Sequence, residues 1–275
     1  MSFSAILAAM RSRIGLVLLV PAVLLAGVAV VVGNNGPVRT PVAAASDETP
    51  PQRKAIEAIV KDYLLKNPEI MLEVQAALEI KMEKVQAQKT AAALKIYAGE
   101  IFRPAFSPIV GNPKGDVTIV EFFDYNCGFC KKALADVAKL IEQEKQVKVV
   151  LKELPILTKG SEEAAKVGLA AKMQGKYWEF HQAMLRNSGQ ANEASALRVA
   201  EKIGLDMPKL KKDMALPEVA KEIDDTRLLA EKLQVRGTPF FMIADRVIPG
   251  APTDLLEQMA KHVAEVRQQG GCKVC

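Results

Sequence analysis

The feature that most constrains the fold is a short apolar run that leads directly into two cysteines. Val117 to Phe123 is rich in β-branched and aromatic residues, which predicts a buried strand. Two residues separate Cys127 from Cys130, and a helical pattern of apolar positions begins at the same point and continues to Ile141. We therefore predict a strand, a tight turn, and a helix that starts at the cysteine pair.

This placement of the cysteines has chemical consequences. A thiol at a helix N-terminus faces unpaired backbone N–H groups and the positive end of the helix dipole, so its thiolate is favoured and its pKa falls. A second thiol one turn later lets the pair close to a disulfide and reopen by exchange. A structural disulfide and half of a zinc site are the alternatives for an isolated C-x-x-C. The strand-to-helix context favours a redox pair, with Cys127 as the exposed nucleophile and Cys130 as the more buried resolving thiol.

The segment from Val117 to Lys132 resembles the active-site segment of the DsbA family of thioredoxin-fold proteins. Downstream, Gly237 to Phe241 resembles the loop in which that fold holds a cis-proline against the cysteine pair. The resemblance extends over about residues 110–267, and residues 52–97 resemble the helical N-terminal region of ScsC-like and Com1-like proteins. It implies an α/β, thioredoxin-like fold with an inserted helical subdomain, and thiol–disulfide oxidoreductase activity on protein cysteines.

The resemblance also implies further site residues. Glu121 matches the buried acid beneath the family's disulfide; burial would raise its pKa and suit it to relay protons, with Lys152 as a candidate partner. The alternative for Glu121 is a strand end that faces solvent. A cis bond before Pro239 would turn backbone groups toward the cysteines and offer pairing to an extended substrate, while the Thr238 hydroxyl binds substrate backbone. We expect no cofactor and no metal at this site.

Two features of the sequence bear on the direction of the reaction: the residues between the cysteines, and the residue before Pro239. Gly128 and Phe129 lie between the cysteines, and neither adds cationic stabilisation to a thiolate. We therefore expect a less depressed pKa and a less oxidising disulfide than in a family member with histidine there. In the resembled families, threonine at the position of Thr238 accompanies isomerase-type members more often than dedicated oxidases.

The N-terminus predicts export. Within residues 1–33, the stretch 14–32 is apolar and uncharged and follows two arginines, and at about 1.5 Å per residue it is long enough to cross a bilayer. It predicts a signal-anchor that tethers the protein to the inner membrane, and a cleaved signal peptide is the alternative. Either predicts a periplasmic location, where disulfides persist. Residues 34–51 are rich in Pro, Ala and Gly and predict a linker.

Residues 52–98 predict a helical region that lacks glycine. Asn67 and Pro68 interrupt it, and we expect Asn67 to cap the second helix, which should end near Tyr97. That second helix carries an apolar stripe, formed by Ile70, Val74, Leu78, Met82 and Val85. A stripe of this kind predicts self-association with other copies, as the ScsC-like resemblance also implies, and packing onto the protein's own catalytic domain is the alternative.

Residues 99–269 are predicted to form the catalytic domain. Strands at 117–123 and 147–152 flank the cysteine helix in a right-handed parallel unit. Residues 160–234 are almost wholly helical and too long for an ordinary connection, so we expect a helical insertion over the active site, with Trp178, Phe180 and Met184 in its core.

The remaining cysteines, Cys272 and Cys275, stand in the tail 270–275. The tail pair is interpreted first as a small terminal disulfide, with a second redox relay pair and a clamp for Cu(I) as alternatives. His181 and His262 fall in helical patterns, where we expect partly exposed side chains. The net charge of +5 is spread without a basic run, so we expect no nucleic-acid partner.

Our leading hypothesis is an exported thiol–disulfide oxidoreductase, of isomerase or reductase type if residues 52–98 form a homo-oligomer. Its partners would be cysteine-containing exported proteins and a membrane redox partner that resets the active-site pair. One alternative is a monomeric DsbA-type dithiol oxidase. A second alternative is a copper-handling envelope protein that uses its C-x-x-C pairs.

Overall fold

The computed structural model describes residues 50–273 and residue 275. The predicted signal or anchor at 1–33 and most of the predicted linker at 34–51 lie outside the described residues. The chain divides into two units, Met1–Asp62 and Tyr63–Cys275. Helix α1 (Pro50–Lys66) spans the boundary between them, and all other elements belong to the second unit. Within the part of the chain that is described, no helix is both long enough and apolar enough to cross a membrane.

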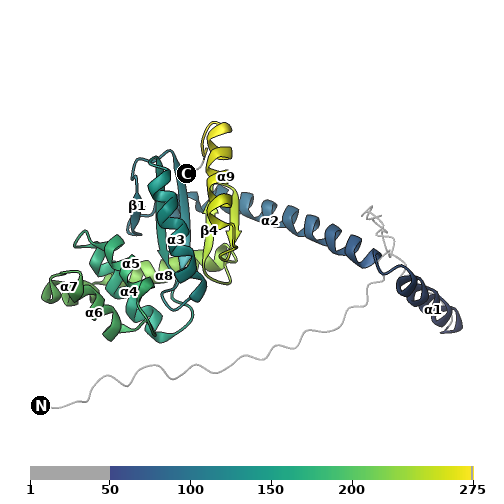
Figure 1. Ribbon diagram of the computed structural model, residues 1–275, viewed down its shortest axis with the longest axis horizontal. Coiled ribbons are helices and arrows are strands. Elements are labelled where there is room, and N and C mark those ends of the chain that lie inside the picture. Colours follow the sequence, from purple (N-terminus) through teal and green to yellow (C-terminus); the bar gives the residue numbers. More distant parts are fainter. Residues whose placement is uncertain (1–49, 274) are drawn as a thin grey trace, which may run out of the picture. The chain divides into compact units, whose positions relative to one another are not determined.

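A five-stranded mixed sheet forms the centre of the second unit (Figure 1). Its strands lie in the order β1 (Ile109–Gly111), β3 (Val147–Glu153), β2 (Val117–Phe123), β4 (Phe240–Ile243) and β5 (Arg246–Pro249). Strands β2 and β3 are parallel and are joined by α3 (Gly128–Gln143), whereas the other neighbours pair antiparallel. The predicted strand–helix–strand unit and the thioredoxin-like α/β fold are confirmed.

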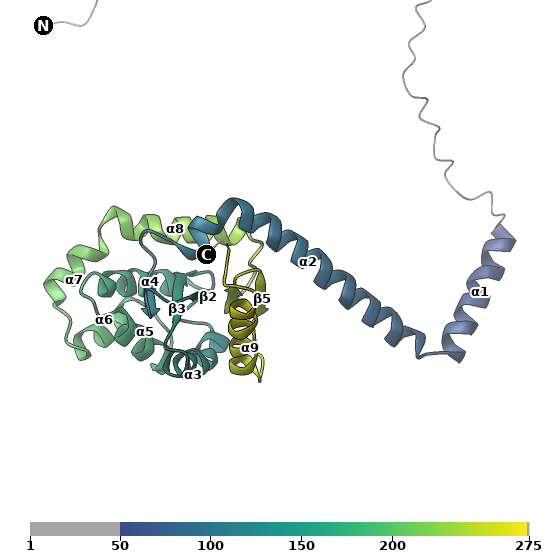
Figure 2. The same ribbon diagram turned by 90° about the horizontal axis from the view of Figure 1, so that it is seen from above.

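The two faces of the sheet bury different helices. Because successive strand residues point to opposite faces, Ile119 and Phe123 of β2 join one core with α3 and α9 (Leu255–Gln268). Val120 and Phe122 join a second core with α2 (Ile70–Phe102) and α8 (Pro217–Lys232). Figure 2 shows the sheet between these two layers. The cysteine helix therefore lies on the α9 side of the sheet.

Helices α4 to α8 occupy the predicted insertion. They are α4 (Lys159–Lys172), α5 (Tyr177–Arg186), α6 (Glu193–Lys202), α7 (Met207–Met214) and α8. The side chains of Thr158, Asn192 and Asp206 cap α4, α6 and α7 by accepting hydrogen bonds from backbone N–H groups. In the predicted core of the insertion, Phe180 and Met184 are fully buried, and Trp178 is partly exposed and packs against the buried cluster to which they belong.

Helix α2 differs from its predicted course at both ends. It extends to Phe102 rather than ending near Tyr97, because Leu94, Ile101 and Phe102 are buried in the second core and hold the last turns. Asn67 does not cap α2: its side-chain amide donates to the carbonyl of Tyr63, 2.8 Å away, and so closes α1 instead.

His181 also differs from expectation. It is 1% exposed, rather than partly exposed, and its ring stacks between those of Tyr177 and Trp178. Burial lowers the pKa of its imidazole to about 3. Helical spacing alone did not identify the face of α5 that is covered. His262 is partly exposed, as expected, and contacts Glu265.

The close packing around Gly168 in α4 gives a first testable prediction. A Cβ atom there would lie 2.9 Å from Oε1 of Glu153 and 3.0 Å from the hydroxyl oxygen of Tyr125. Both neighbours are buried, so they have little room to move. We expect Gly168→Ala to lower the free energy of unfolding by about 1–3 kcal/mol, measured by denaturant titration.

Gly99 provides the matched control. It is exposed within α2, and no atom lies within 4 Å of the position that a Cβ would take. Gly99→Ala should stabilise the protein by up to about 1 kcal/mol through helix propensity. Equal effects of the two substitutions would contradict the packing at Gly168.

Candidate active site

Cys127 is the N-cap of α3, with its backbone in an extended conformation. A hydrogen bond from the thiol of Cys130 lowers the pKa of Cys127 to about 5. Burial opposes this effect, whereas the Thr238 side chain and the backbone N–H groups of Cys130 and Phe129 also lower the pKa. The structure thus places the thiol where the sequence predicted it, with the lowered pKa expected at a helix N-terminus.

The two cysteines differ in exposure and in acidity. Cys130 is completely buried, and burial raises the pKa of its thiol. Cys127 is only 6% exposed, so the nucleophile is more buried than the sequence led us to expect. The reason is the Thr238 carbonyl, which accepts a hydrogen bond from the Cys127 sulfur 3.0 Å away. Cys127 is still the more accessible and more acidic thiol of the pair.

The Thr238–Pro239 loop lies against Cys127 and forms the other side of the site. The peptide bond between these residues is cis, as predicted, and the contact with Cys127 joins segments 111 residues apart in sequence. Pro239 is buried and Thr238 is partly exposed. Within the described part of the chain, the Thr238 hydroxyl is buried without a hydrogen-bond partner. A buried polar group in this state lacks the hydrogen bond that such groups ordinarily make.

Glu121 lies beneath the cysteines on β2 and is 2% exposed, so it is not a strand end that faces solvent. Burial raises the pKa of its carboxyl to about 8, and the negative charge of Cys127 adds to the rise. Lys152 is not its partner. Glu121 pairs in register with Leu151, so Lys152 points to the opposite face, where its Nζ lies 3.9 Å from the Oε1 of Glu222.

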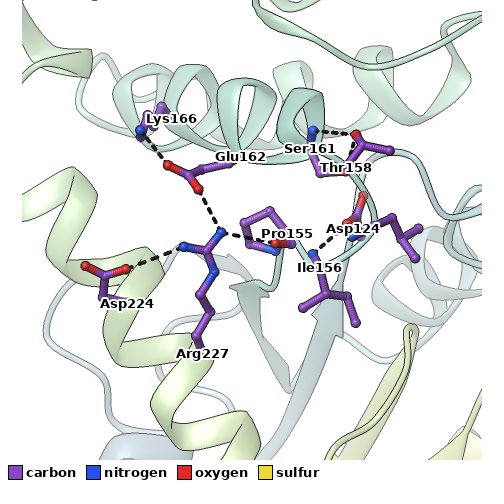
Figure 3. A network of polar contacts seen from close by, with 10 residues as sticks. Asp124, Pro155, Ile156, Thr158, Ser161, Glu162, Lys166, Asp224 and Arg227 are labelled. Atoms are coloured by element: carbon purple, nitrogen blue, oxygen red, sulfur yellow. Dashed lines mark hydrogen bonds and ion pairs between the residues drawn. The ribbon is translucent and has the colours of Figure 1, made fainter.

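A polar network ties the active-site loop to the insertion (Figure 3). The Asp124 carboxylate accepts hydrogen bonds from the backbone N–H groups of Ile156 and Leu157 at 2.9 and 3.0 Å. On the same segment, Arg227 of α8 donates to the Pro155 carbonyl at 3.2 Å. Asp124 was not among the site residues predicted from the sequence. Its only signal was a polar residue between a buried strand and the cysteine pair.

The chain matches a family model described as "DSBA-like thioredoxin domain" over residues 118–264, a little more than half of its length. This chain belongs to the DSBA-like thioredoxin family. Residues 52–92 of this DSBA-like protein also match the "Copper resistance protein ScsC N-terminal domain". The family performs thiol–disulfide oxidoreductase chemistry, and the Cys127–Cys130 pair lies within the matched region.

Solved structures support this assignment. A thioredoxin-like oxidoreductase from Silicibacter pomeroyi is 44% identical, with a TM-score of 0.59, and the match covers 62% of this chain and 97% of that one. A linker-deletion mutant of Proteus mirabilis ScsC is 25% identical, with a TM-score of 0.62, over 82% of this chain and 99% of that one.

Curated relatives include much longer proteins. The DSBA-like protein is 30% identical over 138 residues to the Na(+)/H(+) antiporter NhaA 3 of Salinispora tropica. That match covers 50% of this chain and only 21% of the antiporter. The chain therefore spans about a fifth of this relative's length.

A second buried carboxyl lies near the site of the DSBA-like protein. Glu153, at the end of β3, accepts hydrogen bonds from the hydroxyls of Tyr125 and Tyr177 at 3.1 and 2.7 Å. Burial raises the pKa of this carboxyl well above its ordinary range. Tyr125 is two residues before Cys127, so the cluster packs directly behind the active-site turn. Glu153 was not predicted as a site residue, because no local sequence pattern shows which tyrosines its carboxyl contacts.

The tail cysteines of the DSBA-like protein form a disulfide, Cys272–Cys275, as the first of the three interpretations predicted. Both are partly exposed. In contrast, Cys127 and Cys130 are free thiols in the same structure.

Proposed function

We propose that this protein is an exported thiol–disulfide oxidoreductase that rearranges disulfides in other exported proteins and works as a homo-oligomer assembled through residues 52–98. The observation that carries the proposal is the Cys127 sulfur, which has a pKa lowered to about 5 and lies 3.0 Å from the Thr238 carbonyl. A thiolate that is populated at neutral pH, beside a loop that can bind extended backbone, suits attack on a protein disulfide.

The first step is attack by the Cys127 thiolate on one sulfur of a substrate disulfide. A bond forms between Cys127 and that sulfur, the substrate S–S bond breaks, and the other substrate sulfur leaves as a thiolate. In isomerisation, a substrate thiolate then attacks the mixed disulfide and restores Cys127 without net electron transfer. In reduction, Cys130 attacks the Cys127 sulfur, and the reduced substrate leaves. A membrane redox partner then supplies two electrons and reduces the Cys127–Cys130 disulfide back to two thiols.

Glu121 is proposed as the proton acceptor for Cys130. While Cys127 is a thiolate, the burial of Glu121 and the negative charge of Cys127 together raise the pKa of the Glu121 carboxyl to about 8, so this carboxyl is protonated at pH 7. Formation of the mixed disulfide removes that negative charge, which lowers the pKa of Glu121. The Glu121 carboxyl then ionises more readily. The resulting carboxylate can accept the proton that the buried Cys130 thiol must lose before it attacks.

Thr238 and Pro239 are proposed as the substrate-binding residues. The Thr238 carbonyl lies against Cys127, and among the described residues the Thr238 hydroxyl has no partner at hydrogen-bond distance, although it is close enough to Cys127 to lower the pKa of that thiol. An extended substrate segment that binds here would supply the missing hydrogen bond.

Oligomerisation is supported by the apolar stripe of α2. Val74, Leu78 and Met82 are 55%, 54% and 63% exposed, so the stripe is not covered by the catalytic domain. Exposed apolar side chains at helical spacing favour association with a like surface. The match of residues 52–92 to the ScsC N-terminal domain points the same way. Several active sites on one assembly would hold a misfolded chain at more than one point.

The test compares the wild type with Leu78→Glu/Met82→Glu, which places two carboxylates in the stripe. The control, Ala76→Glu/Ile80→Glu, places the same number of carboxylates at exposed positions on the opposite face of α2. We expect wild type and control to be oligomers by light scattering and to reactivate scrambled ribonuclease. The stripe variant should be a monomer that has lost isomerase activity but still oxidises dithiols. A monomeric wild type, or a stripe variant with full isomerase activity, would refute the oligomeric isomerase.

The second candidate is a monomeric dithiol oxidase, which the low pKa of Cys127 favours. A stabilised thiolate makes the reduced form more stable and the disulfide more oxidising. Equal dithiol oxidation by monomer and wild type, without isomerase activity in either, would favour this oxidase. The copper-handling alternative is tested by copper titration of Cys127→Ser against Cys272→Ser.

We place the protein in the periplasm, where one of its structural neighbours, a thioredoxin-like protein from Salmonella enterica, is found. Residues 14–32 act there either as a cleaved signal or as an inner-membrane tether. Determining the N-terminal residue of the mature protein distinguishes the two.

A further inference from the structure

The tail disulfide lies far from the active site. Arg267, near the end of α9, pairs with Asp116 and Glu144, which mark the start of β2 and the end of α3. Cys127 stands at the other end of both elements. The seven residues of β2 span roughly 20 Å at about 3.3 Å per residue. The Cys272–Cys275 disulfide therefore cannot exchange with Cys127 of its own chain.

The surroundings of the disulfide leave room for a reacting thiol. Cys272 lines a hollow of about 510 Å³ between the tail, α2 and the turn before β5. Lys95 and Lys273 also line it and are exposed, whereas the Asp245 carboxylate there is paired with Arg246. The lysines give the hollow a positive character, which attracts a thiolate.

The disulfide itself is poorly suited to a purely structural role. It closes a loop of only four residues at the end of the described chain, and such a short loop constrains the unfolded chain least. One backbone N–H group already lies where it would stabilise a reduced cysteine. The N–H of Cys275 donates to the Cys272 sulfur at 3.1 Å, a contact that strengthens when the sulfur becomes a thiolate.

We propose that Cys272–Cys275 is a second thiol–disulfide exchange site, separate from Cys127–Cys130, whose substrate is a thiolate. An incoming thiolate attacks the Cys272 sulfur, a bond forms between them, and Cys275 leaves as a thiolate. A second thiolate attacks the bound one and releases Cys272. Two substrate thiols are thereby oxidised to one disulfide, and the tail pair takes up the two electrons and the two protons.

Two sources share this chemistry: a small anionic thiol such as glutathione, and the reduced Cys127–Cys130 pair of another copy. The experiment uses full-length Cys127→Ser/Cys130→Ser, in which only the tail can react. In one arm the oxidised variant is incubated with millimolar glutathione. In the other arm it is mixed with pre-reduced Cys272→Ser/Cys275→Ser. Free thiols are located by maleimide labelling and peptide mass mapping, which assigns each label to a cysteine, because the two variants have the same intact mass and exchange leaves the total number of thiols unchanged. Circular dichroism verifies that the protein stays folded.

We expect labels on both Cys272 and Cys275 of the folded protein in at least one arm, and the arm that reacts identifies the source. Labelling that occurs in neither arm, but does occur after reduction in denaturant, would overturn the proposal. The glutathione arm does not involve Cys127 or Cys130, so its result is independent of the function proposed for that pair.

Discussion

Replacing Cys127 with serine is expected to lower disulfide isomerase and reductase activity by roughly 10³-fold or more. The serine hydroxyl does not ionise near neutral pH, so the hydrogen bond from Cys130 and the N–H groups of α3 have no anion to stabilise. Cys130 cannot replace it, because it is completely buried and burial raises the pKa of its thiol. The measurement is reactivation of scrambled ribonuclease, with circular dichroism to show that the variant is folded.

Cys130→Ser provides the contrast. This variant keeps the attacking thiol but lacks the resolving one, so it should accumulate a mixed disulfide with substrate that is visible on a non-reducing gel. The same experiment on Cys127→Ser should show none. Accumulation through Cys130 in the Cys127→Ser variant would show that the two roles are reversed.

The acidity of Cys127 can be measured directly in the wild-type protein. The alkylation rate of the reduced wild type should rise with a midpoint at about pH 5 and stay flat from pH 6 to 8. A midpoint near the ordinary thiol value of 9.0 would remove the basis for the assigned nucleophile.

The parts of this site that sequence predicted are those with a local signal. The strand that ends at Phe123 and the cysteine spacing gave the turn and the helix, and the downstream Thr238–Pro239 pair came from resemblance. What sequence did not give depends on contacts between distant segments. The Asp124 carboxylate binds backbone N–H groups 32 and 33 residues away, and any residue type supplies those groups.

The errors have the same origin. Lys152 was considered as a partner for Glu121 because both lie on central strands, but strand alternation and the register of β2 with β3 point them to opposite faces. His181 follows an ordinary amphipathic pattern, and only the fold shows that Tyr177 and Trp178 enclose it. Cys127 is less exposed than expected, since the carbonyl that covers it comes from residue 238.

The buried carboxyl of Glu121 should contribute less to the stability of the reduced protein as the pH rises. Its pKa is about 8 in the folded protein, against an ordinary value of 4.5. The unfolded chain therefore loses this proton first, and the contribution of Glu121 to the free energy of unfolding falls as the pH rises from 4.5 to about 8, whereas the lowered pKa of Cys127 contributes in the opposite direction. At about 1.4 kcal/mol per pKa unit, the contribution is on the order of 4–5 kcal/mol.

Glu121→Gln removes the ionisable group and should remove this loss. We expect the variant to gain stability relative to the wild type, little at pH 4 and on the order of 4–5 kcal/mol at pH 8, by denaturant titration of the reduced proteins. Glu201→Gln, at an exposed position on α6, controls for the loss of one carboxyl. A difference between Glu121→Gln and the wild type that does not vary with pH would contradict the buried, protonated carboxyl.

The same variant should slow catalysis although it stabilises the fold. Without a carboxylate to accept the Cys130 proton, attack of Cys130 on the mixed disulfide should slow by about 10²-fold, the usual size of a lost general base. The first step, attack by the Cys127 thiolate, needs no base at pH 7 and should be much less affected. Rapid-mixing measurement of the two steps separates them, and equal slowing of both would mean that Glu121 only shapes the site. A protein that becomes more stable at pH 8 and resolves its mixed disulfide more slowly is the outcome that a proton acceptor at Glu121 requires.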